Sequence, residues 1–191
     1  MKKTILLMAA AMFSIGAFAQ STWKNDPMHS KLGFTITHLS VSDVDGIFTD
    51  FSCTIASAKP DFSDAKFQLT ANTTSINTDV DYRDKDLRSA NYFDVANFPT
   101  LTFTSTGITA VSTNHYKLTG NLTLHGVTKS VTMDLWYRGT ITNPMTKKDD
   151  AGFKLSGTIN RKDFGIAPNA PNAMLSEDVT INANGEFGKV N

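Results

Sequence analysis

The chain has 191 residues, a mass of 20.8 kDa and a formal net charge of +0 at neutral pH. Charged residues at 19% and hydrophobic residues at 40% exclude a disordered chain, and the balanced charge excludes nucleic-acid binding by bulk electrostatics. A single cysteine, Cys53, excludes an intrachain disulfide.

Residues 1–19 have the pattern of an export signal. Lys2 and Lys3 precede an apolar run over 5–18, and the run ends in the small-x-small sequence of residues 17–19. The run is too short, and too directly followed by polar sequence, for a membrane span, and no later run of about 18 apolar residues exists. We therefore expect cleavage after Ala19 and one domain over 20–191, with a slight excess of acidic residues.

Alternation of apolar and polar residues with a period of two dominates the remaining sequence, and helical periodicity is nearly absent. The pattern predicts about eight strands, around 32–36, 46–56, 67–71, 100–106, 118–124, 131–135, 153–159 and 179–183. It fits a β-sandwich with a solid core and an up-and-down barrel with room for a small ligand equally well. An outer-membrane barrel has girdles of aromatic residues, and two Trp and four Tyr are few for them. The composition therefore favours a soluble barrel over an outer-membrane barrel.

Three segments interrupt the alternation. Residues 78–89 predict a short helix, on which Thr78 and Asp81 have the spacing of a capping box. Residues 139–151 predict a solvated loop. Residues 161–178 predict a longer connection with several apolar side chains, which contacts a greasy ligand or folds down onto the end of the sheet.

The sequence offers little for catalysis. It lacks a glycine-rich phosphate loop, a G-x-S-x-G elbow, a C-x-x-C pair and an H-E-x-x-H helix. The spacings of His29 with His38, and of His115 with His125, do not suit local metal chelation. Cys53 lies on a predicted strand, which favours a buried, inert thiol. We therefore expect no enzyme activity, no catalytic residues, no cofactor and no metal.

Arg83 and Arg161 have two interpretations. Each guanidinium is close in sequence to an aspartate and so suits a structural ion pair. Each also suits the phosphate or carboxylate of a ligand at the mouth of a barrel.

Several longer motifs resemble those of YceI-like domains, in the same order and over residues 23 to about 187. They are WKNDPMHS at 23–30, GIFTDF at 46–51, RDKDLRSANYFDVANFPTLTF at 83–103, GNLTLHGVT at 120–128 and RKDFGI at 161–166. The resemblance implies an extended, lipocalin-like antiparallel barrel, soluble and periplasmic, with an elongated apolar cavity for a polyisoprenoid or another long-chain amphiphile. The family is not associated with one established reaction.

Candidate site residues follow from the side of each predicted strand that carries the apolar residues. We expect the cavity to be lined by Phe34, Ile36, Phe67, Leu69, Phe103, Leu122, Leu124, Met133, Leu135, Phe153 and Leu155. At the mouth or against a ligand headgroup we expect His38, Arg83, Phe93, Arg161, Ile166 and Met174.

Three hypotheses for function remain open at this point. The first is a periplasmic carrier of a polyisoprenoid, an isoprenoid quinone or a fatty-acyl lipid. The second is an enzyme that acts on a lipid or quinone in the same pocket, with a polar cluster such as His38 near Arg161. The third is a stress-response or interaction module with a filled core and no ligand. Pairing of edge strands leaves a homodimer open.

Overall fold

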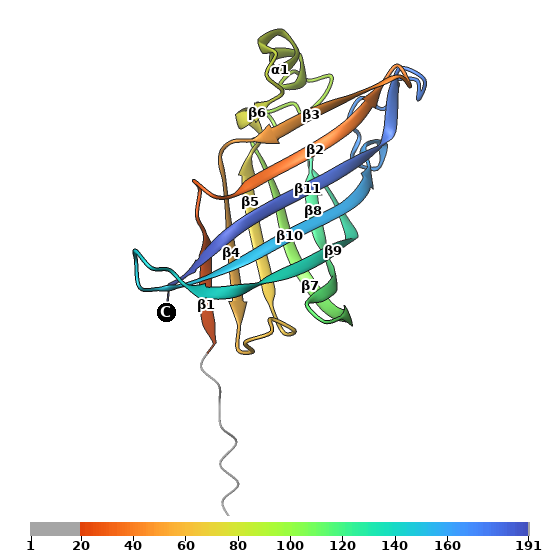
Figure 1. Cartoon of the computed structure of the whole chain (residues 1–191). Helices are drawn as coiled ribbons and strands as arrows, with labels where there is room; N and C mark the ends of the chain where they lie inside the picture. Colours follow the sequence, from red (N-terminus) through yellow and green to blue (C-terminus); the bar gives the residue numbers. More distant parts are fainter. Residues whose placement is uncertain (1–19, 191) are drawn as a thin grey trace, which may run out of the picture.

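The computed structural model describes residues 20–190, which form one antiparallel sheet with a short helix and two 3-10 turns (Figure 1). The elements are β1 (Ser21–Asn25), β2 (Lys31–His38), β3 (Ser42–Phe48), β4 (Phe51–Ser57), β5 (Lys66–Asn72), η1 (Thr73–Ser75), β6 (Ile76–Asn77), α1 (Asp81–Leu87), β7 (Thr100–Ser112), β8 (His115–Leu124), β9 (Val127–Thr142), β10 (Asp149–Asn160), η2 (Arg161–Phe164) and β11 (Leu175–Lys189). None of the helices in this part of the chain has the length and apolar character needed to cross a bilayer.

The sheet closes on itself. β1 pairs with β4 on one side and with the end of β11 on the other, so the order β1-β4-β5-β7-β8-β9-β10-β11 returns to its start. β2 continues along the same flank of β11, and β3 pairs with β2. The result is a closed barrel of eight antiparallel strands, in which β1 with β2, and β3 with β4, each occupy one position. The all-β class and the lipocalin-like barrel are confirmed, and the β-sandwich is excluded.

Two strand positions are bent rather than continuous. The strand predicted over 46–56 is interrupted at Thr49 and Asp50, which hydrogen-bond to Ser75 at distances of 3.1–3.2 Å. The segment 26–30 separates β1 from β2 in the same way. Such bends let long, tilted strands follow a curved wall. Alternation alone did not predict them, because the Ser75 contact joins distant parts of the chain.

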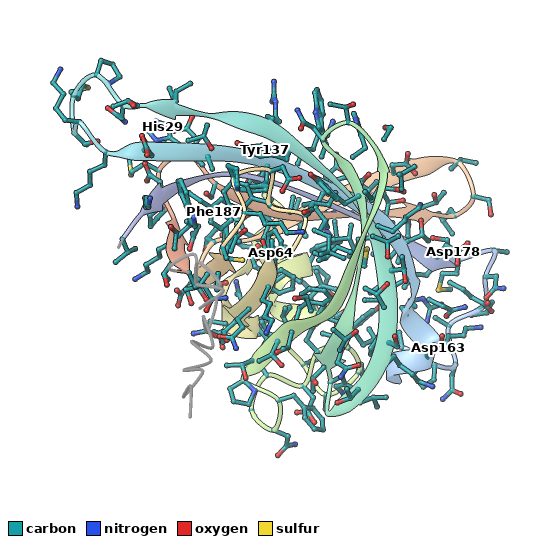
Figure 2. The ribbon with its side chains drawn as sticks, turned by 90° about the horizontal axis from the view of Figure 1, so that it is seen from below. His29, Asp64, Tyr137, Asp163, Asp178 and Phe187 are labelled. Atoms are coloured by element: carbon teal, nitrogen blue, oxygen red, sulfur yellow. The ribbon has the colours of Figure 1, made fainter. Side chains whose placement is uncertain are left out.

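One end of the barrel is packed solid. Phe62, from the β4–β5 connection, is 2% exposed, and its ring centroid lies 4.9 Å from that of Tyr137, 5.0 Å from that of Phe153 and 5.3 Å from that of Trp23. Figure 2 looks from below, with Tyr137 and Phe187 labelled, and both belong to this cluster. The aromatic floor, as we call the cluster around Phe62, therefore fills the β1 end of the barrel as a core.

The opposite end is covered by α1 and by the connection between η2 and β11 (Figure 1). The helix begins at Asp81 after a Val80 cap, so the predicted capping box of Thr78 and Asp81 is wrong. Instead, an Asp84 carboxylate oxygen accepts hydrogen bonds from the backbone N (2.9 Å) and Oγ1 (2.5 Å) of Thr78. Because the carboxylate is buried, these bonds join the helix firmly to the chain before it.

The two predicted loops are shorter than expected. β9 and β10 extend into the 139–151 segment, which leaves a turn over 143–148. The 161–178 segment begins with η2 and ends in β11, and its Phe164 is 1% exposed in the core. This connection therefore folds down onto the barrel end.

Candidate ligand-binding cavity

A cavity of about 480 Å³ lies between the aromatic floor and α1. Nearly every strand of the barrel contributes to its wall, and most of the side chains that line it are apolar. The volume lies within the range of about 300–1,000 Å³ that is typical of small-molecule sites. The expectation of a filled core without a cavity is therefore wrong, although the aromatic floor itself is packed.

The structure places the expected lining residues in this wall. They are Phe34, Ile36, Phe67, Leu69, Phe103, Leu122, Leu124, Met133, Leu135, Phe153 and Leu155. The strand-by-strand alternation therefore identified the inward side chains correctly.

Other wall residues were not among the candidates. They include Leu32, Val44, Phe48, Phe51, Leu101, Val131, Val179 and Ile181. Leu32, Val179 and Ile181 share the inward parity of their strands, so the same signal was sufficient to find them. Val44 and Phe48 lie on β3, where the break after residue 48 changes the parity between the two halves of the predicted strand.

Two inward glycines make room for aromatic rings in the wall. A Cβ added to Gly46 would lie 2.3 Å from Cζ of Phe34, and a Cβ added to Gly120 would lie 2.4 Å from Cζ of Phe103. Each ring therefore occupies the space above a glycine on the neighbouring strand. A side chain at either glycine would push the ring away from the wall.

Arg83 lies on α1, at the mouth of the cavity. Its Nε donates to Oγ1 of Thr78 and its Nη2 donates to the carbonyl of Thr78, both at 2.8 Å. Among residues 20–190, Nη1 of Arg83 has no acceptor. The side chain is half-buried and lines the cavity. A preorganised cation with free donors thus stands at the entrance of an apolar space.

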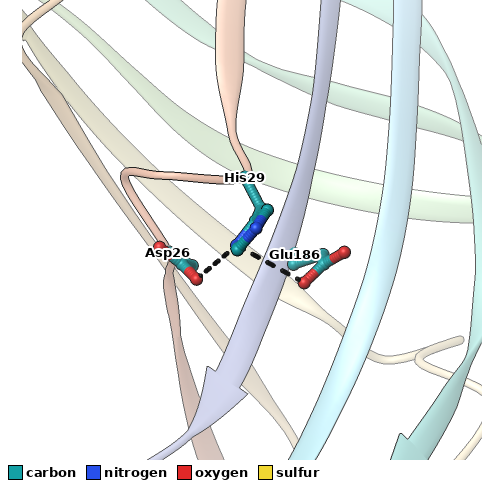
Figure 3. Close-up of side chains that lie close together, drawn as sticks. All are labelled: Asp26, His29 and Glu186. Atoms are coloured by element: carbon teal, nitrogen blue, oxygen red, sulfur yellow. Dashed lines mark hydrogen bonds and ion pairs between the residues drawn. The ribbon is translucent and has the colours of Figure 1, made fainter.

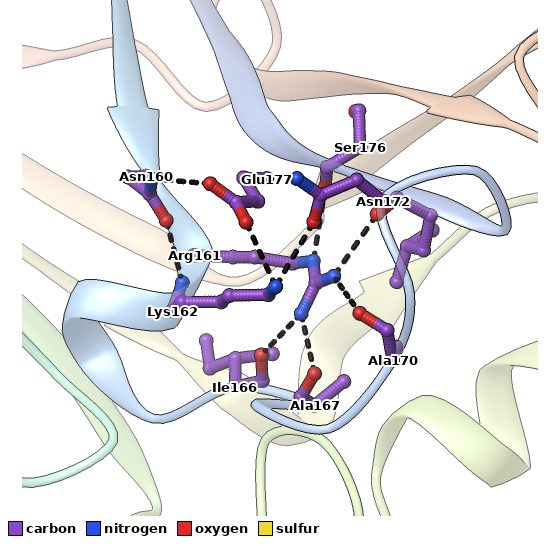
Figure 4. Close-up of polar contacts among 10 residues, drawn as sticks. Asn160, Arg161, Lys162, Ile166, Ala167, Ala170, Asn172, Ser176 and Glu177 are labelled. Atoms are coloured by element: carbon purple, nitrogen blue, oxygen red, sulfur yellow. Dashed lines mark hydrogen bonds and ion pairs between the residues drawn. The ribbon is translucent and has the colours of Figure 1, made fainter.

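Arg161 also lines the cavity, and its guanidinium is enclosed by backbone carbonyls. It is 2% exposed, and burial lowers the pKa of its guanidinium. All five N–H groups donate to backbone carbonyls, as Figure 4 shows. The acceptors are Ser176 (2.9 Å), Ile166 (2.9 Å), Ala167, Ala170 (3.1 Å) and Leu175 (3.0 Å). The structure therefore contradicts the ion pair, because carbonyl groups of the connection before β11 and of the first residues of β11 accept from every donor. The expected headgroup contact stays a prediction.

A second set of contacts fastens the same connection. Nζ of Lys162 lies 2.8 Å from Oε1 of Glu177 and 2.9 Å from Oδ1 of Asn172. The hydrogen bond from Lys162, followed by those from Asn172 and Asn160, lowers the pKa of Glu177 to about 2. The connection is thus a fixed part of the barrel end.

The remaining mouth candidates differ in position. Ile166 and Phe93 line the cavity, and the Phe93 ring centroid lies 5.8 Å from that of Phe48. His38 lines it at the exposed end of β2. Met174 is 51% exposed and is absent from the wall, so its expected place at the mouth stays a prediction. Its side chain points outward because its neighbour Leu175 takes the inward position.

The structure gives little support to catalysis by the suggested polar pair. His38 faces the mouth, but Arg161 has no donor left for a reacting group. Cys53 is 7% exposed, and burial raises the pKa of its thiol to about 12. The buried position expected for this thiol is confirmed.

Asp26, His29 and Glu186 form a surface cluster outside the cavity wall (Figure 3). Nδ1 of His29 lies 2.8 Å from Oδ2 of Asp26 and 3.9 Å from Oε2 of Glu186. The hydrogen bond between His29 and Asp26 raises the pKa of the imidazole and lowers that of the carboxyl. The cluster joins the bend between β1 and β2 to β11. Sequence spacing could not show it, because Glu186 comes from the far end of the chain.

Together these features define a lipocalin-like antiparallel barrel with a packed floor and an apolar cavity beneath α1. A model of the YceI-like domain matches residues 23–187. Protein YceI of Salmonella newport (strain SL254) is 38% identical over 189 residues, which cover 97% of this chain and 98% of that protein. The chain therefore belongs to the YceI-like family, as its motifs indicated.

Solved structures agree with this assignment. The YCEI protein of Campylobacter jejuni has a TM-score of 0.74 at 31% identity, over 81% of this chain and 90% of that one. A polyisoprenoid binding domain from Saccharophagus degradans has a TM-score of 0.66 at 16% identity, over 90% of this chain and 99% of that one. The second likeness shows the shared fold.

Proposed function

We propose that the protein is a periplasmic carrier that holds a long-chain amphiphile, tail first, in the cavity. The amphiphile is a polyisoprenoid, an isoprenoid quinone or a fatty-acyl lipid. The observation that carries the proposal is the apolar cavity of about 480 Å³ between the aromatic floor and α1. The export-signal pattern of residues 1–19, which lie outside the described residues, and the polyisoprenoid binding domain of similar fold support it.

The energetics of tail burial suit a carrier. A tail of about 20 carbons gains on the order of 16 kcal/mol, at about 0.8 kcal/mol for each buried CH₂. Association and ordering cost about 4–15 kcal/mol. The difference permits useful but reversible binding, so tail length and cavity shape set selectivity more than charge does.

The polar head of the amphiphile stays at the mouth in this proposal. The wall offers few polar partners at depth, and an unpaired polar group there is costly. Arg83 has free Nη1 donors at the entrance, which favours an anionic head such as a phosphate or carboxylate.

The test is mass spectrometry of the native protein purified from the periplasm, with a variant in which the cavity is filled. Ala183 lines the cavity, so Ala183→Trp places an indole in the lumen. Ala110→Trp, at an exposed position on β7, is the matched control. We expect an adduct of several hundred daltons on the native protein and on the control, and none on Ala183→Trp.

Two results would contradict the carrier function. One is a clean apo mass of the native protein together with no uptake of added long-chain lipids. The other is equal lipid uptake by Ala183→Trp and Ala110→Trp, provided that both variants unfold at the same urea concentration as the native protein.

A further inference from the structure

Exposed apolar side chains gather beside the cavity mouth, on the side opposite to the charged helix. Leu39 and Val41, in the β2–β3 turn, are 52% and 83% exposed, and Met174, before β11, is 51% exposed. We call these three residues the apolar rim. In Figure 1 the β2–β3 turn and the connection before β11 meet at the upper right of the barrel.

The apolar rim is a built feature of the fold. The backbone N of Leu39 donates to the carbonyl of Met174 at 2.9 Å, and Oγ of Ser40 donates to the carbonyl of Ala173 at 3.4 Å. Leu39 has a φ of 52°, which is unfavourable for leucine. The turn thus displays Leu39 and Val41 in a backbone conformation that the neighbouring connection holds in place.

The apolar rim is continuous with the cavity wall. His38 and Leu175, the chain neighbours of Leu39 and Met174, both line the cavity. An amphiphile that leaves the cavity on this side therefore meets apolar side chains first. The rim and the wall form one surface along which an apolar tail stays in contact with protein.

Charge divides the mouth into two unlike sides. The connection over 164–176 has no charged residue, and neither has the turn over 39–42. The helix on the other side, with the sequence DYRDKDL, is mostly charged. Only the side with the apolar rim can leave water without burying an unpaired charge.

We propose that the apolar rim docks the protein on a lipid bilayer, so that an amphiphile passes between the membrane and the cavity without crossing water. The inference rests on the proposed lipid-carrier function. Asp43, Glu177 and Asp178 flank the rim, so attraction to anionic lipid does not drive the docking. Neutral phospholipid is therefore the favoured surface, and the docking is weak, reversible and little affected by salt.

The first experiment measures transfer of a fluorescent long-chain fatty acid from phosphatidylethanolamine–phosphatidylcholine vesicles to the protein. The test variant combines Leu39→Asn, Val41→Ser and Met174→Gln. Asparagine tolerates positive φ, so the turn is retained. The control combines Ile141→Thr and Met145→Gln, at exposed positions of 65% and 90% near the β9–β10 turn, at the opposite end of the barrel (Figure 1).

We expect the rim variant to take up fatty acid about tenfold more slowly from vesicles, and the control to match the native protein. Uptake of the same fatty acid dispersed without vesicles reaches the same final level in all three proteins. Equal rates of transfer from vesicles for the rim variant and the native protein would overturn the docking proposal.

A second experiment tests docking independently of ligand uptake. Val41→Cys and Met145→Cys each carry a polarity-sensitive fluorophore, which Cys53 does not take up because its thiol is buried. We expect vesicles to shift the emission of the label at position 41 to the blue and to leave position 145 unchanged. No shift at position 41 overturns docking. A shift at 41 in a protein that takes up no lipid supports docking and contradicts the carrier function instead.

Discussion

Arg161 shows how far the sequence could predict the role of a single residue. Its position near the barrel end follows from the strand pattern. Its contacts do not, because the five carbonyl groups come from the way the 165–176 segment folds around it. An arginine beside Asp163 in sequence suggested an ion pair, and the structure replaces that pair with a buried hydrogen-bonding hub.

Replacement of Arg161 should strongly destabilise the barrel end. Arg161→Ala leaves five carbonyls without their donor, and we expect a loss of about 4 kcal/mol in the free energy of unfolding. Arg161→Lys should lie between that variant and the native protein, because an ammonium has fewer donors. Urea denaturation measures both. Arg138→Lys, at an exposed position, should change the free energy of unfolding by less than about 0.5 kcal/mol. Equal changes in the free energy of unfolding at Arg161 and Arg138 would contradict the structural role of the five hydrogen bonds.

The His29–Asp26 pair predicts a pH dependence of stability. The pair raises the pKa of His29 above 6.5, so its contribution is complete below that value and is lost as pH rises through the folded-state pKa. It lowers the pKa of Asp26 below 3.8, so the contribution is also lost as pH falls through the folded-state pKa of that carboxyl. The pair therefore stabilises the fold between these two limits.

An NMR titration of His29 and urea midpoints of His29→Gln measure this effect. The midpoint difference from the native protein should shrink as pH rises above neutrality. Asp26→Asn should return the His29 pKa toward its ordinary value. An unchanged His29 titration in Asp26→Asn is inconsistent with the pair.

At the scale of elements, alternation found a segment of each long strand of the wall, because the wall has one apolar face and one wet face, but it missed β1 and β6 and the outer parts of β7, β9 and β11. It missed the break at Thr49 and Asp50, since a hydrogen-bonded contact with Ser75 decides where the strand bends. It also placed the helix start too early. The side chain of Thr78 bonds to Asp84 instead of capping the first turn, a choice between two nearby aspartates that spacing cannot decide.

The pairing of glycine with an aromatic ring across two strands is testable at Gly46. Gly46→Ala should force the Phe34 ring into the lumen, lower stability by about 1–3 kcal/mol and weaken uptake of long-chain lipid. Adding Phe34→Leu should restore both in part, because Cγ2 of Thr78 also lies 2.9 Å from the added Cβ. Gly107→Ala is the control, because a Cβ there meets nothing within 4 Å. Urea denaturation and lipid titration report the two effects, and equal behaviour of the two alanine variants would argue against the pairing.

At the scale of the whole molecule, the alternation could not predict whether the sheet closes into a barrel. Sandwich and barrel share the same alternation, and the deciding pair is β1 with β11, which joins the two ends of the described chain. The alternation also could not predict that the aromatic floor is packed while the space between it and α1 is a cavity. The packing of the floor depends on Phe62, a residue of a connection, which inserts among rings from three different elements.

The packed aromatic floor blocks one end of the barrel for the proposed cargo. A chain that slides in beneath α1 meets the tilted and edge-on rings of the floor, so in this proposal it leaves by reversing its path. The head group then enters last at loading and leaves first at delivery. The direction of net transport would be decided by the receiving side, and the barrel itself would have no preferred direction.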